Sequence, residues 1–331
     1  MKILVTGGLG FIGSHTVVSL QENGFEVVII DNLYNTRLDV LNNISQITGK
    51  KPIYYNIDLR NKQAVQDFFK KELDIEGVIH FAASKAVNES VENPLLYYEN
   101  NINALVYLLQ ELEKLPQVKF IFSSSCTVYG QADEMPITEN ANLKQATSPY
   151  GNTKSIGEEI INDVANISKI DAILLRYFNP IGAHKSALIG ELPIGIPQNL
   201  IPFITQTAIG KRQELSVYGN DYPTPDGTCI RDYIHVVDLA EAHVIALKRL
   251  LENKNLEKVE VFNLGTGKGS SVLEVIESFE KVSHQKLPYK IVNRRAGDII
   301  VAYANTQKAN DILGWIAKYT IYASLLSAWT W

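Results

Sequence analysis

Residues 2–13 of the chain read KILVTGGLGFIG, and this stretch decides the fold. The apolar run 2–6 has the composition of a buried parallel strand, and a glycine-rich turn follows it directly. Glycines permit a tight turn and a close approach of the backbone to a ligand. The helix that follows offers unpaired N–H groups and its positive dipole end to a pyrophosphate. The N-terminus therefore predicts a dinucleotide-binding βαβ unit.

A carboxylate stands at the end of the second predicted strand. Asp31 follows Gly13 by 18 residues, near the spacing at which a carboxylate accepts hydrogen bonds from the adenosine ribose. Its negative charge would repel a 2′-phosphate, so the sequence favours NAD over NADP. The alternative is a turn-forming glycine cluster beside an unrelated strand-end acid. The strand, the spacing and the acid together favour the cofactor.

The first half of the chain alternates short apolar runs with amphipathic stretches, which is typical of a doubly wound parallel sheet with helices on both faces. We predict strands, each buried on both faces, at 2–6, 26–31, 53–57, 77–82, 119–124 and 172–176. The clearest helix is predicted at 94–115, where an apolar stripe recurs at helical spacing: Leu95, Tyr98, Ile102, Leu105, Leu109 and Leu112. The predicted fold is α/β, Rossmann-like, with a smaller α+β C-terminal domain.

The alternating pattern ends after Asn179, where the loop-rich segment 180–228 begins. We place an NAD-binding domain at 1–179 and a substrate-binding domain at 180–331. The segment 230–264 again reads strand, helix, strand, and it is open to a return into the first domain.

Composition excludes several classes of protein. The 331 residues are 46% hydrophobic and 20% charged, with a net charge of -5, which would repel a nucleic-acid backbone. No run of about 18 apolar residues is present, so we expect no membrane partner. Cys126 and Cys229 are too few for a disulfide framework, and we expect a cytoplasmic protein.

Tyr150 and Lys154 form the strongest catalytic candidate outside the glycine loop. Their spacing places a phenol and an ammonium on one face of a helix, for which Ser148 and Pro149 are a suitable cap and first residue. A nearby cation stabilises a phenolate, so Lys154 would make Tyr150 a better base. Alone, this spacing favours a half-buried Tyr and a solvated Lys over a catalytic pair. The upstream dinucleotide motif favours catalysis.

Hydroxyl side chains follow the fifth predicted strand, at the sheet edge where open α/β sheets hold ligands. The stretch 123–130 reads SSSCTVYG, and Ser125 could hydrogen-bond the oxygen that gives its proton to Tyr150. The alternative is a Ser-rich loop that satisfies its own backbone.

Four motifs, taken together, resemble the extended short-chain dehydrogenase/reductase family; they lie at 6–13, 123–130, 148–154 and 176–180. Four further and partly more specific stretches agree, at 81–87, 98–103, 218–224 and 226–236. The resemblance covers nearly the whole chain and implies NAD as cofactor, a UDP-sugar bound by 180–331, and a homodimer formed by the helices that begin near Pro94 and Pro149.

The resemblance also implies the binding residues. NAD would be held by Gly7, Gly10, Phe11, Ile12, Gly13, Asp31, Asn32, Asn35, Asp58, Leu59, Phe81, Ala82, Lys85, Asn100, Ser123, Tyr150, Lys154 and Tyr177. Of these, Asp31 and Asn35 would bind the adenosine ribose and Asp58 the adenine. The UDP-sugar would contact Lys85, Ser125, Tyr150, Phe178, Asn179, Asn199, Leu200, Tyr218, Arg231, Tyr233, Arg295, Asp298 and Ala302.

The activity implied by the resemblance is that of an isomerase in carbohydrate metabolism, which interconverts UDP-galactose and UDP-glucose through a transient 4-keto sugar. Tyr150 would take the proton of the sugar 4-hydroxyl, Lys154 would lower the pKa of Tyr150, and Ser125 would orient the hydroxyl. The cofactor would stay bound through the cycle. We expect no metal, since the histidines show no ligand spacing.

Two departures from related enzymes bear on the reaction. Cys126 and Thr127 follow Ser125, where sugar-nucleotide dehydratases have an acidic pair, and this favours epimerisation. A dehydratase or decarboxylase remains the nearer alternative, and a non-catalytic dinucleotide sensor the more distant one. Ala302 stands where some members have a bulky tyrosine, so we hypothesise that UDP-GlcNAc and UDP-GalNAc are also accepted. Tyr303 would fill the gap after a one-residue shift.

Overall fold

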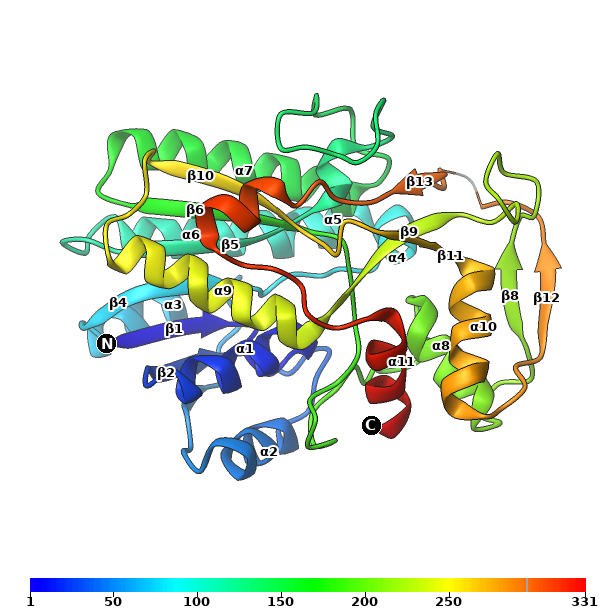
Figure 1. Ribbon diagram of the computed structural model, residues 1–331. Helices are drawn as coiled ribbons and strands as arrows, with labels where there is room; N and C mark the ends of the chain where they lie inside the picture. Colours follow the sequence, from blue (N-terminus) through cyan, green and yellow to red (C-terminus); the bar gives the residue numbers. More distant parts are fainter. Residues whose placement is uncertain (296) are drawn as a thin grey trace.

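The fold is built on a seven-stranded sheet in which every strand is parallel to its neighbours (Figure 1). The computed structural model describes residues 1–295 and 297–331. The strand order is β10-β6-β5-β4-β1-β2-β3, so the chain winds outward in both directions from β1. The bounds are β1 Lys2–Thr6, β2 Glu26–Ile30, β3 Ile53–Tyr55, β4 Ile75–His80, β5 Lys119–Ser125, β6 Asp171–Tyr177 and β10 Val259–Leu264. The predicted doubly wound, Rossmann-like sheet is confirmed.

Helices cover both faces of this sheet because successive strand residues point to opposite sides. Ile3 and Val5 of β1 face one core and Leu4 faces the other. The first core is covered by α1 (Phe11–Glu22), α2 (Asp39–Thr48) and α9 (Val236–Leu251). The second is covered by α3 (Lys62–Lys71), α6 (Ala104–Leu112) and α7 (Pro149–Ile167). Each fully buried aliphatic side chain contributes about 1.5–3 kcal/mol, so these two cores dominate the stability.

The six predicted strands are all present, and one of them differs in burial. We expected 53–57 to be buried on both faces, but β3 has only three residues, and Ile53 is exposed. Its position contributes to this exposure, because β3 is one of the two edge strands of the sheet and has a single neighbour, β2.

The predicted helix at 94–115 is interrupted by a π-helical segment. It consists of α5 (Pro94–Tyr98), the π-helix Glu99–Asn103 and α6, which ends at Leu112. A π-helix adds a residue to the turn and rotates the buried face. Tyr97 is therefore fully buried in place of Tyr98, and Leu95 at the start of the predicted stripe is 81% exposed.

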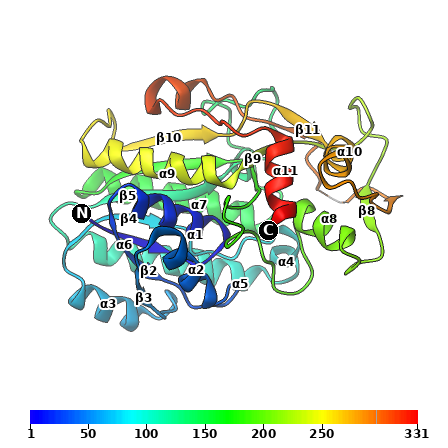
Figure 2. The ribbon, with the colours of Figure 1, turned by 60° about the horizontal axis from the view of Figure 1, so that its bottom comes forward.

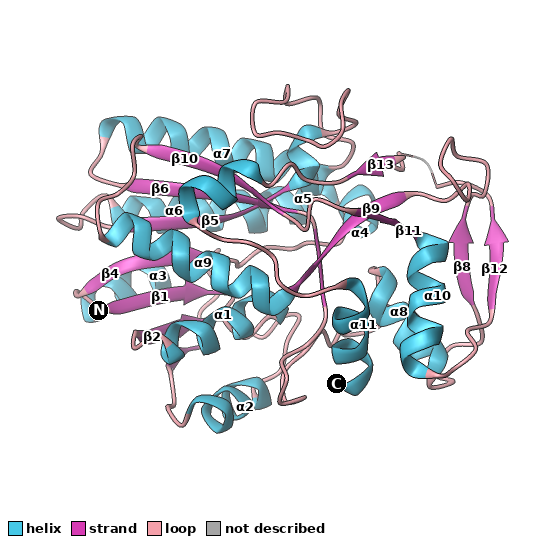
Figure 3. Cartoon of the chain, viewed as in Figure 1, coloured by secondary structure: helices cyan, strands magenta, loops and turns pink. Residues whose placement is uncertain are grey.

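The second part of the molecule surrounds a small sheet. Its strand β9 (Ile230–His235) pairs with β7 (Asn179–Ile181), β11 (Gly269–Ser271) and β13 (Val301–Ala302). A parallel pair, β8 (Leu215–Tyr218) and β12 (Tyr289–Val292), lies far from the large sheet (Figures 2 and 3). The helices here are α8 (Leu200–Ala208), α10 (Val272–Ser283) and α11 (Ile321–Thr330). Helix α8 lies in the segment predicted to be loop.

The segment 230–264 is divided between the two parts. Strand β10 joins the large sheet beside β6, and α9 packs in the core on one face of it. Strand β9 instead forms the centre of the small sheet. Short helices complete the described chain: α4 (Val87–Glu92), the 3-10 helix Cys126–Tyr129 and the π-helix Ala309–Leu313. None of the described helices has the length and apolarity needed to cross a membrane.

Candidate active site

A cavity of about 910 Å³ lies at the carboxyl edge of the large sheet, where doubly wound folds bind their ligands. The loops that follow β1 to β4, the end of β5 and the start of α7 line one side, and residues 189–202 line the other. Every residue predicted to bind NAD lines this cavity. The predicted substrate residues that also line it are Lys85, Ser125, Tyr150, Phe178, Asn179 and Asn199.

The glycine turn between β1 and α1 forms a cradle that side chains would fill. Gly7 has a φ of 68°, and a Cβ there would lie 2.8 Å from the backbone nitrogen of Ala82. A Cβ on Gly13 would overlap the carbonyl oxygen of Gly7. Gly10 is the N-cap of α1 and provides no side-chain hydrogen bond, so the first N–H groups of the helix are available to an anion. The cradle therefore fits a dinucleotide pyrophosphate.

Asp31 is fixed in place at the end of β2. Its carboxylate accepts hydrogen bonds from the backbone N–H of Leu9 at 3.1 Å and of Leu33 at 2.9 Å. The side chain is 6% exposed, and burial raises its pKa despite these two bonds. A carboxylate held in this way suits the bidentate recognition of a ribose diol.

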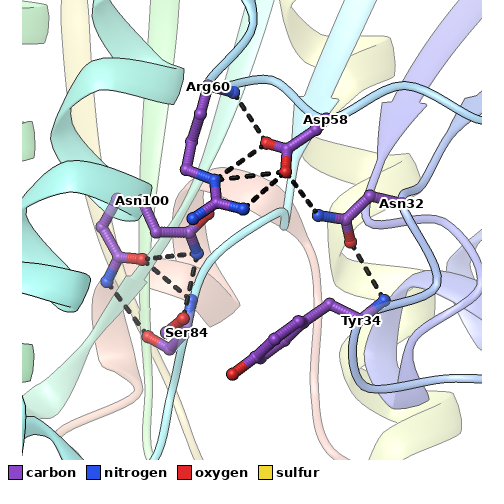
Figure 4. Close-up of polar contacts among 7 residues, drawn as sticks. Asn32, Tyr34, Asp58, Arg60, Ser84 and Asn100 are labelled. Carbon is purple, nitrogen blue, oxygen red and sulfur yellow. Dashed lines mark hydrogen bonds and ion pairs between the residues drawn. The ribbon is translucent and has the colours of Figure 1, made fainter.

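A group of polar side chains surrounds Asp58, which follows β3 (Figure 4). The guanidinium of Arg60 contacts both carboxylate oxygens, with Nη2 2.7 Å from Oδ2 and Nε 3.1 Å from Oδ1. Asn32 donates to Oδ2 at 3.3 Å. The Arg60 bonds hold the pKa of Asp58 below its ordinary value. Arg60 lines the cavity but was not among the predicted residues. Its position two residues after the predicted Asp58 was the only feature of the sequence that could have indicated it.

The start of α7 brings Tyr150 and Lys154 to the cavity. Ser148 caps the helix by accepting a hydrogen bond from the N–H of Gly151 at 3.1 Å, as predicted. The Nζ of Lys154 donates to the carbonyl oxygen of Ser123 at 2.6 Å and lies 5.9 Å from the centre of the Tyr150 ring. Strand β5 and helix α7 therefore hold the ammonium beside the phenol.

In the protein by itself burial dominates the pKa of Tyr150, and the expectation that Lys154 lowers this pKa stays a prediction. Burial raises the pKa of Tyr150 to about 12, although the hydroxyl of Ser125 acts to lower it. Burial also lowers the pKa of Lys154 to about 8. Desolvation penalises the charged form of each group and is the largest cause of both shifts. At neutral pH the phenol is therefore protonated, and Lys154 keeps its proton.

Asn101 connects the loop after β4 to the catalytic helix, and the sequence analysis missed it. Its side-chain Oδ1 accepts from Ser84 N at 2.8 Å, and Nδ2 donates to Ser84 O and to Thr153 Oγ1, both at 3.0 Å. The neighbouring Asn100, which was predicted, donates to Ser84 Oγ at 3.0 Å (Figure 4). Asn101 belongs to the π-helix, a feature often found at functional sites, which no sequence pattern indicated.

A third missed residue, Glu191, contacts two predicted ones. Its Oε1 accepts from the Nζ of Lys85 at 3.0 Å and from the Nδ2 of Asn199 at 2.7 Å. Lys85 follows β4, and Asn199 immediately precedes α8. The contact therefore links the large sheet to the second part of the molecule, and its sequence separation of 106 residues left no local signal.

The other predicted substrate residues are not among the residues that line this cavity: Leu200, Tyr218, Arg231, Tyr233, Arg295, Asp298 and Ala302. Arg295 lies over the ring of Tyr218, 4.7 Å from its centre, and forms an ion pair with Asp298 at 3.0 Å. Burial raises the pKa of Tyr233 to about 12, opposed by the charge of Arg231. Two arginines and two tyrosines suit a phosphorylated, aromatic ligand.

The side chain of Tyr303 does not lie on the same side of the strand as that of Ala302. Ala302 in β13 is opposite Arg231 of β9 and packs in a small apolar cluster with Phe178. Side chains alternate along a strand, so Tyr303 points the other way, toward Gly269. The one-residue shift that would bring Tyr303 into this space is absent from the described pairing of β13 with β9.

The parallel sheet, the glycine cradle and the Ser125, Tyr150 and Lys154 constellation define a dinucleotide-binding protein of the short-chain dehydrogenase/reductase class. A family profile described as GDP-mannose 4,6 dehydratase matches residues 4–325. A UDP-glucose 4-epimerase of Bacillus subtilis is 50% identical over 100% of this chain and 96% of its own length. The chain therefore belongs to the UDP-glucose 4-epimerase family, which confirms the predicted resemblance.

Two solved structures of similar proteins agree with this assignment. UDP-glucose 4-epimerase from Bifidobacterium longum, in complex with NAD+ and UDP, is 46% identical with a TM-score of 0.95, covering 100% of this chain and 98% of that one. The UDP-Glc/GlcNAc 4-epimerase from Campylobacter jejuni is 35% identical with a TM-score of 0.85, covering 99% and 98%.

Proposed function

We propose that this chain is an NAD-dependent isomerase that interconverts UDP-galactose and UDP-glucose by inverting C4 of the hexose. The observation that carries the proposal is the meeting of a dinucleotide cradle with Ser125, Tyr150 and Lys154 in one cavity. The enzyme class and the cofactor predicted from the sequence are confirmed by the names of the relatives and by the NAD+ complex of the Bifidobacterium longum protein.

The cavity residues have separate roles in this proposal. Gly7, Gly10 and Gly13 would hold the NAD pyrophosphate, Asp31 with Asn35 the ribose, and Asp58 the adenine. Lys85, Tyr150 and Lys154 would surround the nicotinamide side. Bound NAD supplies a hydride acceptor for C4 and, when oxidised, a positive charge that favours the phenolate.

Tyr150 moves the proton in the proposed reaction. After losing its own proton, Tyr150 as a phenolate would take the proton from the sugar 4-hydroxyl as the 4-keto sugar forms, and return it when C4 is reduced from the opposite face. A phenol with a pKa of about 12 is a poor base at neutral pH. Lys154 lowers the cost of the phenolate because its own pKa of about 8 keeps it charged there. Ser125 would orient the sugar hydroxyl.

A dehydratase is the nearest competing function, since the matching profile carries that description. Elimination of water needs an acid and a base beside the sugar, and Cys126 and Thr127 occupy the positions after Ser125. Burial raises the pKa of Cys126 to about 11, so its thiol stays protonated and cannot replace a carboxylate base. The site therefore favours epimerisation.

Acceptance of N-acetylated UDP-sugars is a second proposal, and it rests on Ala302. The small side chain and the outward direction of Tyr303 leave the neighbourhood of Phe178 without a bulky residue from β13. The Campylobacter jejuni relative, whose name includes GlcNAc, supports the idea. Turnover of UDP-GlcNAc to UDP-GalNAc by the purified chain is the expected result.

The domain roles, the oligomeric state and the location are also proposals. Residues 1–179 would bind NAD and 180–331 the UDP-sugar, with α9 and β10 supporting the first. A homodimer is supported by Leu95, which is 81% exposed at the start of α5. If the dimer forms there, Leu95→Glu yields a monomer in analytical ultracentrifugation. Two free cysteines are consistent with a cytoplasmic location.

The decisive experiment supplies UDP-galactose to the purified chain without added NAD. The expected product is UDP-glucose, an isomer of unchanged mass, because the cofactor stays bound. A product lighter by one water would establish a dehydratase. In a parallel assay with a UDP-uronic acid, a product lighter by carbon dioxide would establish a decarboxylase. Absence of any product with NAD added would favour a dinucleotide sensor.

A further inference from the structure

The adenine end of the cavity contains a carboxylate with an unusually complete set of donors. Asp58 Oδ1 accepts from the backbone N–H of Arg60 at 2.9 Å, and Arg60 Nε lies 3.1 Å from both carboxylate oxygens. Arg60 Nη2 donates to Oδ2 at 2.7 Å, and Asn32 Nδ2 donates to the same oxygen at 3.3 Å. Asp58, Arg60 and Asn32 all line the cavity, and Figure 4 shows the contacts among them.

The Arg60 contacts fix both the plane and the charge of the carboxylate. Forked bonds from a guanidinium leave a carboxylate little freedom to rotate. They also lower the pKa of Asp58, so the group is ionised at neutral pH and can only accept hydrogen bonds. A fixed group that only accepts is complementary to an N–H2 group and repels a carbonyl oxygen.

Asn32 shows which kind of donor this carboxylate can take. Its amide is an NH2 group on a planar carbon, as is the 6-amino group of adenine. At 3.3 Å it is the longest of the bonds to Asp58, and therefore the one most easily exchanged for a ligand. In the protein without ligand, Oδ2 of Asp58 thus accepts a hydrogen bond from a neutral amide group.

Stability does not account for the pair. Arg60 and Asp58 are 34% and 32% exposed, they are two residues apart, and such partly solvated pairs contribute little to folding. Both residues line the cavity, as a binding role requires.

We infer that Arg60 is a positioning residue that holds Asp58 as a fixed acceptor selecting a 6-aminopurine, and that the Asn32 amide gives up its place on Oδ2 to the purine. This inference rests on the proposed NAD-binding function. It extends that function by naming the group that enforces the choice of base, and it places no contact between Arg60 and the base itself.

The test is a competition between NAD and its hypoxanthine analogue, which carries a carbonyl oxygen in place of the 6-amino group. The full chain is equilibrated with NAD and the analogue, each at the same concentration and in excess over the protein. The bound dinucleotides are then released and quantified by chromatography. The variants are Arg60→Met, Asp58→Asn and the double variant. Arg37→Met is the matched control, because Arg37 also lines the cavity but pairs with Asp39.

The wild-type chain is expected to prefer NAD by about tenfold, the contribution of one hydrogen bond to a charged group. Arg60→Met should lower the preference to about twofold, and Arg37→Met should leave it unchanged. In the Asp58→Asn background, Arg60→Met should change the ratio less than twofold, because Arg60 acts through Asp58.

Two results would overturn the inference. One is an Arg60→Met chain that retains the wild-type preference. The other is an equal effect of Arg60→Met with and without Asp58. If Arg60→Met does not fold, Arg60→Gln, which retains a polar side chain but lacks the forked charge, takes its place with the same expected ratio. A wild-type chain that binds both dinucleotides equally contradicts this inference alone, whereas one that binds neither contradicts the proposed function.

Discussion

The two ends of the proposed site are built differently. The cofactor end lies on a sheet whose strands are buried on both faces, and its polar groups are held by short contacts such as Lys154 to Ser123 O. The predicted uridine diphosphate end lies near the β8 and β12 pair, where Tyr218, Tyr289 and Ile291 are exposed. The edge of a parallel sheet therefore forms the cofactor end, and the exposed β8 and β12 pair lies at the predicted uridine diphosphate end.

This contrast separates the effects of substitutions. Changes at the cofactor end should affect the chemical step or the retention of NAD, and changes at the other end should affect the KM for the UDP-sugar. The four predictions below test that separation, in order of decreasing effect.

Tyr150→Phe should reduce kcat for UDP-galactose by about 10²–10⁴-fold, the usual range for loss of a general base. Bound NAD should stay at the wild-type level, because the glycine cradle is unchanged. A coupled assay for UDP-glucose and the absorbance of released cofactor measure the two quantities. Tyr98→Phe is the matched control, since its hydroxyl contacts Asn152 on the same helix and its loss should change kcat less than twofold. Near-normal turnover by Tyr150→Phe would remove the proposed base.

Arg295→Met should raise the KM for UDP-galactose by about 10–100-fold, because a charge-assisted bond to phosphate is lost. The level of bound NAD should not change. Arg294→Met is an adjacent control, since Arg294 contacts Asp221 and the Tyr222 ring. Steady-state kinetics should show less than a twofold change for it. A larger KM effect at Arg294 than at Arg295 would contradict the assigned ligand position.

Lys154→Met should stabilise the nucleotide-free chain at pH 7, by on the order of 2 kcal/mol, because it removes a buried charge. The pKa of Lys154 is about 8 in the fold and 10.5 in the unfolded chain, so unfolding takes up a proton between these values. Wild-type stability should therefore rise from pH 8 to 10.5. The variant should lack this component of the rise and lose its advantage there.

Urea denaturation at several pH values measures this effect. Lys119→Met provides the opposite sign, because it would leave the carboxylate of Asp171, 2.6 Å from the Lys119 ammonium, without its buried partner. Destabilisation of both lysine variants at pH 7 would show that burial of the Lys154 ammonium does not lower the stability of the fold.

Ala302→Tyr should reduce turnover of UDP-GlcNAc by about tenfold, since the new side chain takes up space in the sugar pocket. Turnover of UDP-galactose should change less than twofold. Ala304→Tyr is unsuitable as a control because Ala304 is 1% exposed, so Val301→Tyr, on the opposite face of β13, serves instead. Equal loss with both sugars would show that Ala302 does not determine specificity.

Several features were predictable because they are local. The spacing of Tyr150 and Lys154 is fixed by helical geometry once Ser148 caps α7, and the glycine turn needs only the residues between β1 and α1. The meeting of all predicted NAD residues in one cavity follows from the parallel sheet, because the carboxyl ends of its strands lie on one edge.

Other features depended on contacts between distant segments. The π-helix that buries Tyr97 and Asn101 has no signature in the apolar spacing. Glu191 meets Lys85 only because the second part of the chain folds over the cavity. The balance of pKa values was also inaccessible, since it depends on how deeply Tyr150 and Lys154 are buried.

The sequence by itself determined the doubly wound fold, the dinucleotide cradle and the identity of the catalytic candidates, because each depends on periodicity or spacing over a few residues. Only the tertiary structure decided the protonation of Tyr150 and Lys154, the contact of Arg60 with Asp58, and which of the predicted substrate residues line the cavity. Desolvation, forked ion pairing and long-range packing are properties of the assembled chain, and local sequence does not encode them in readable form.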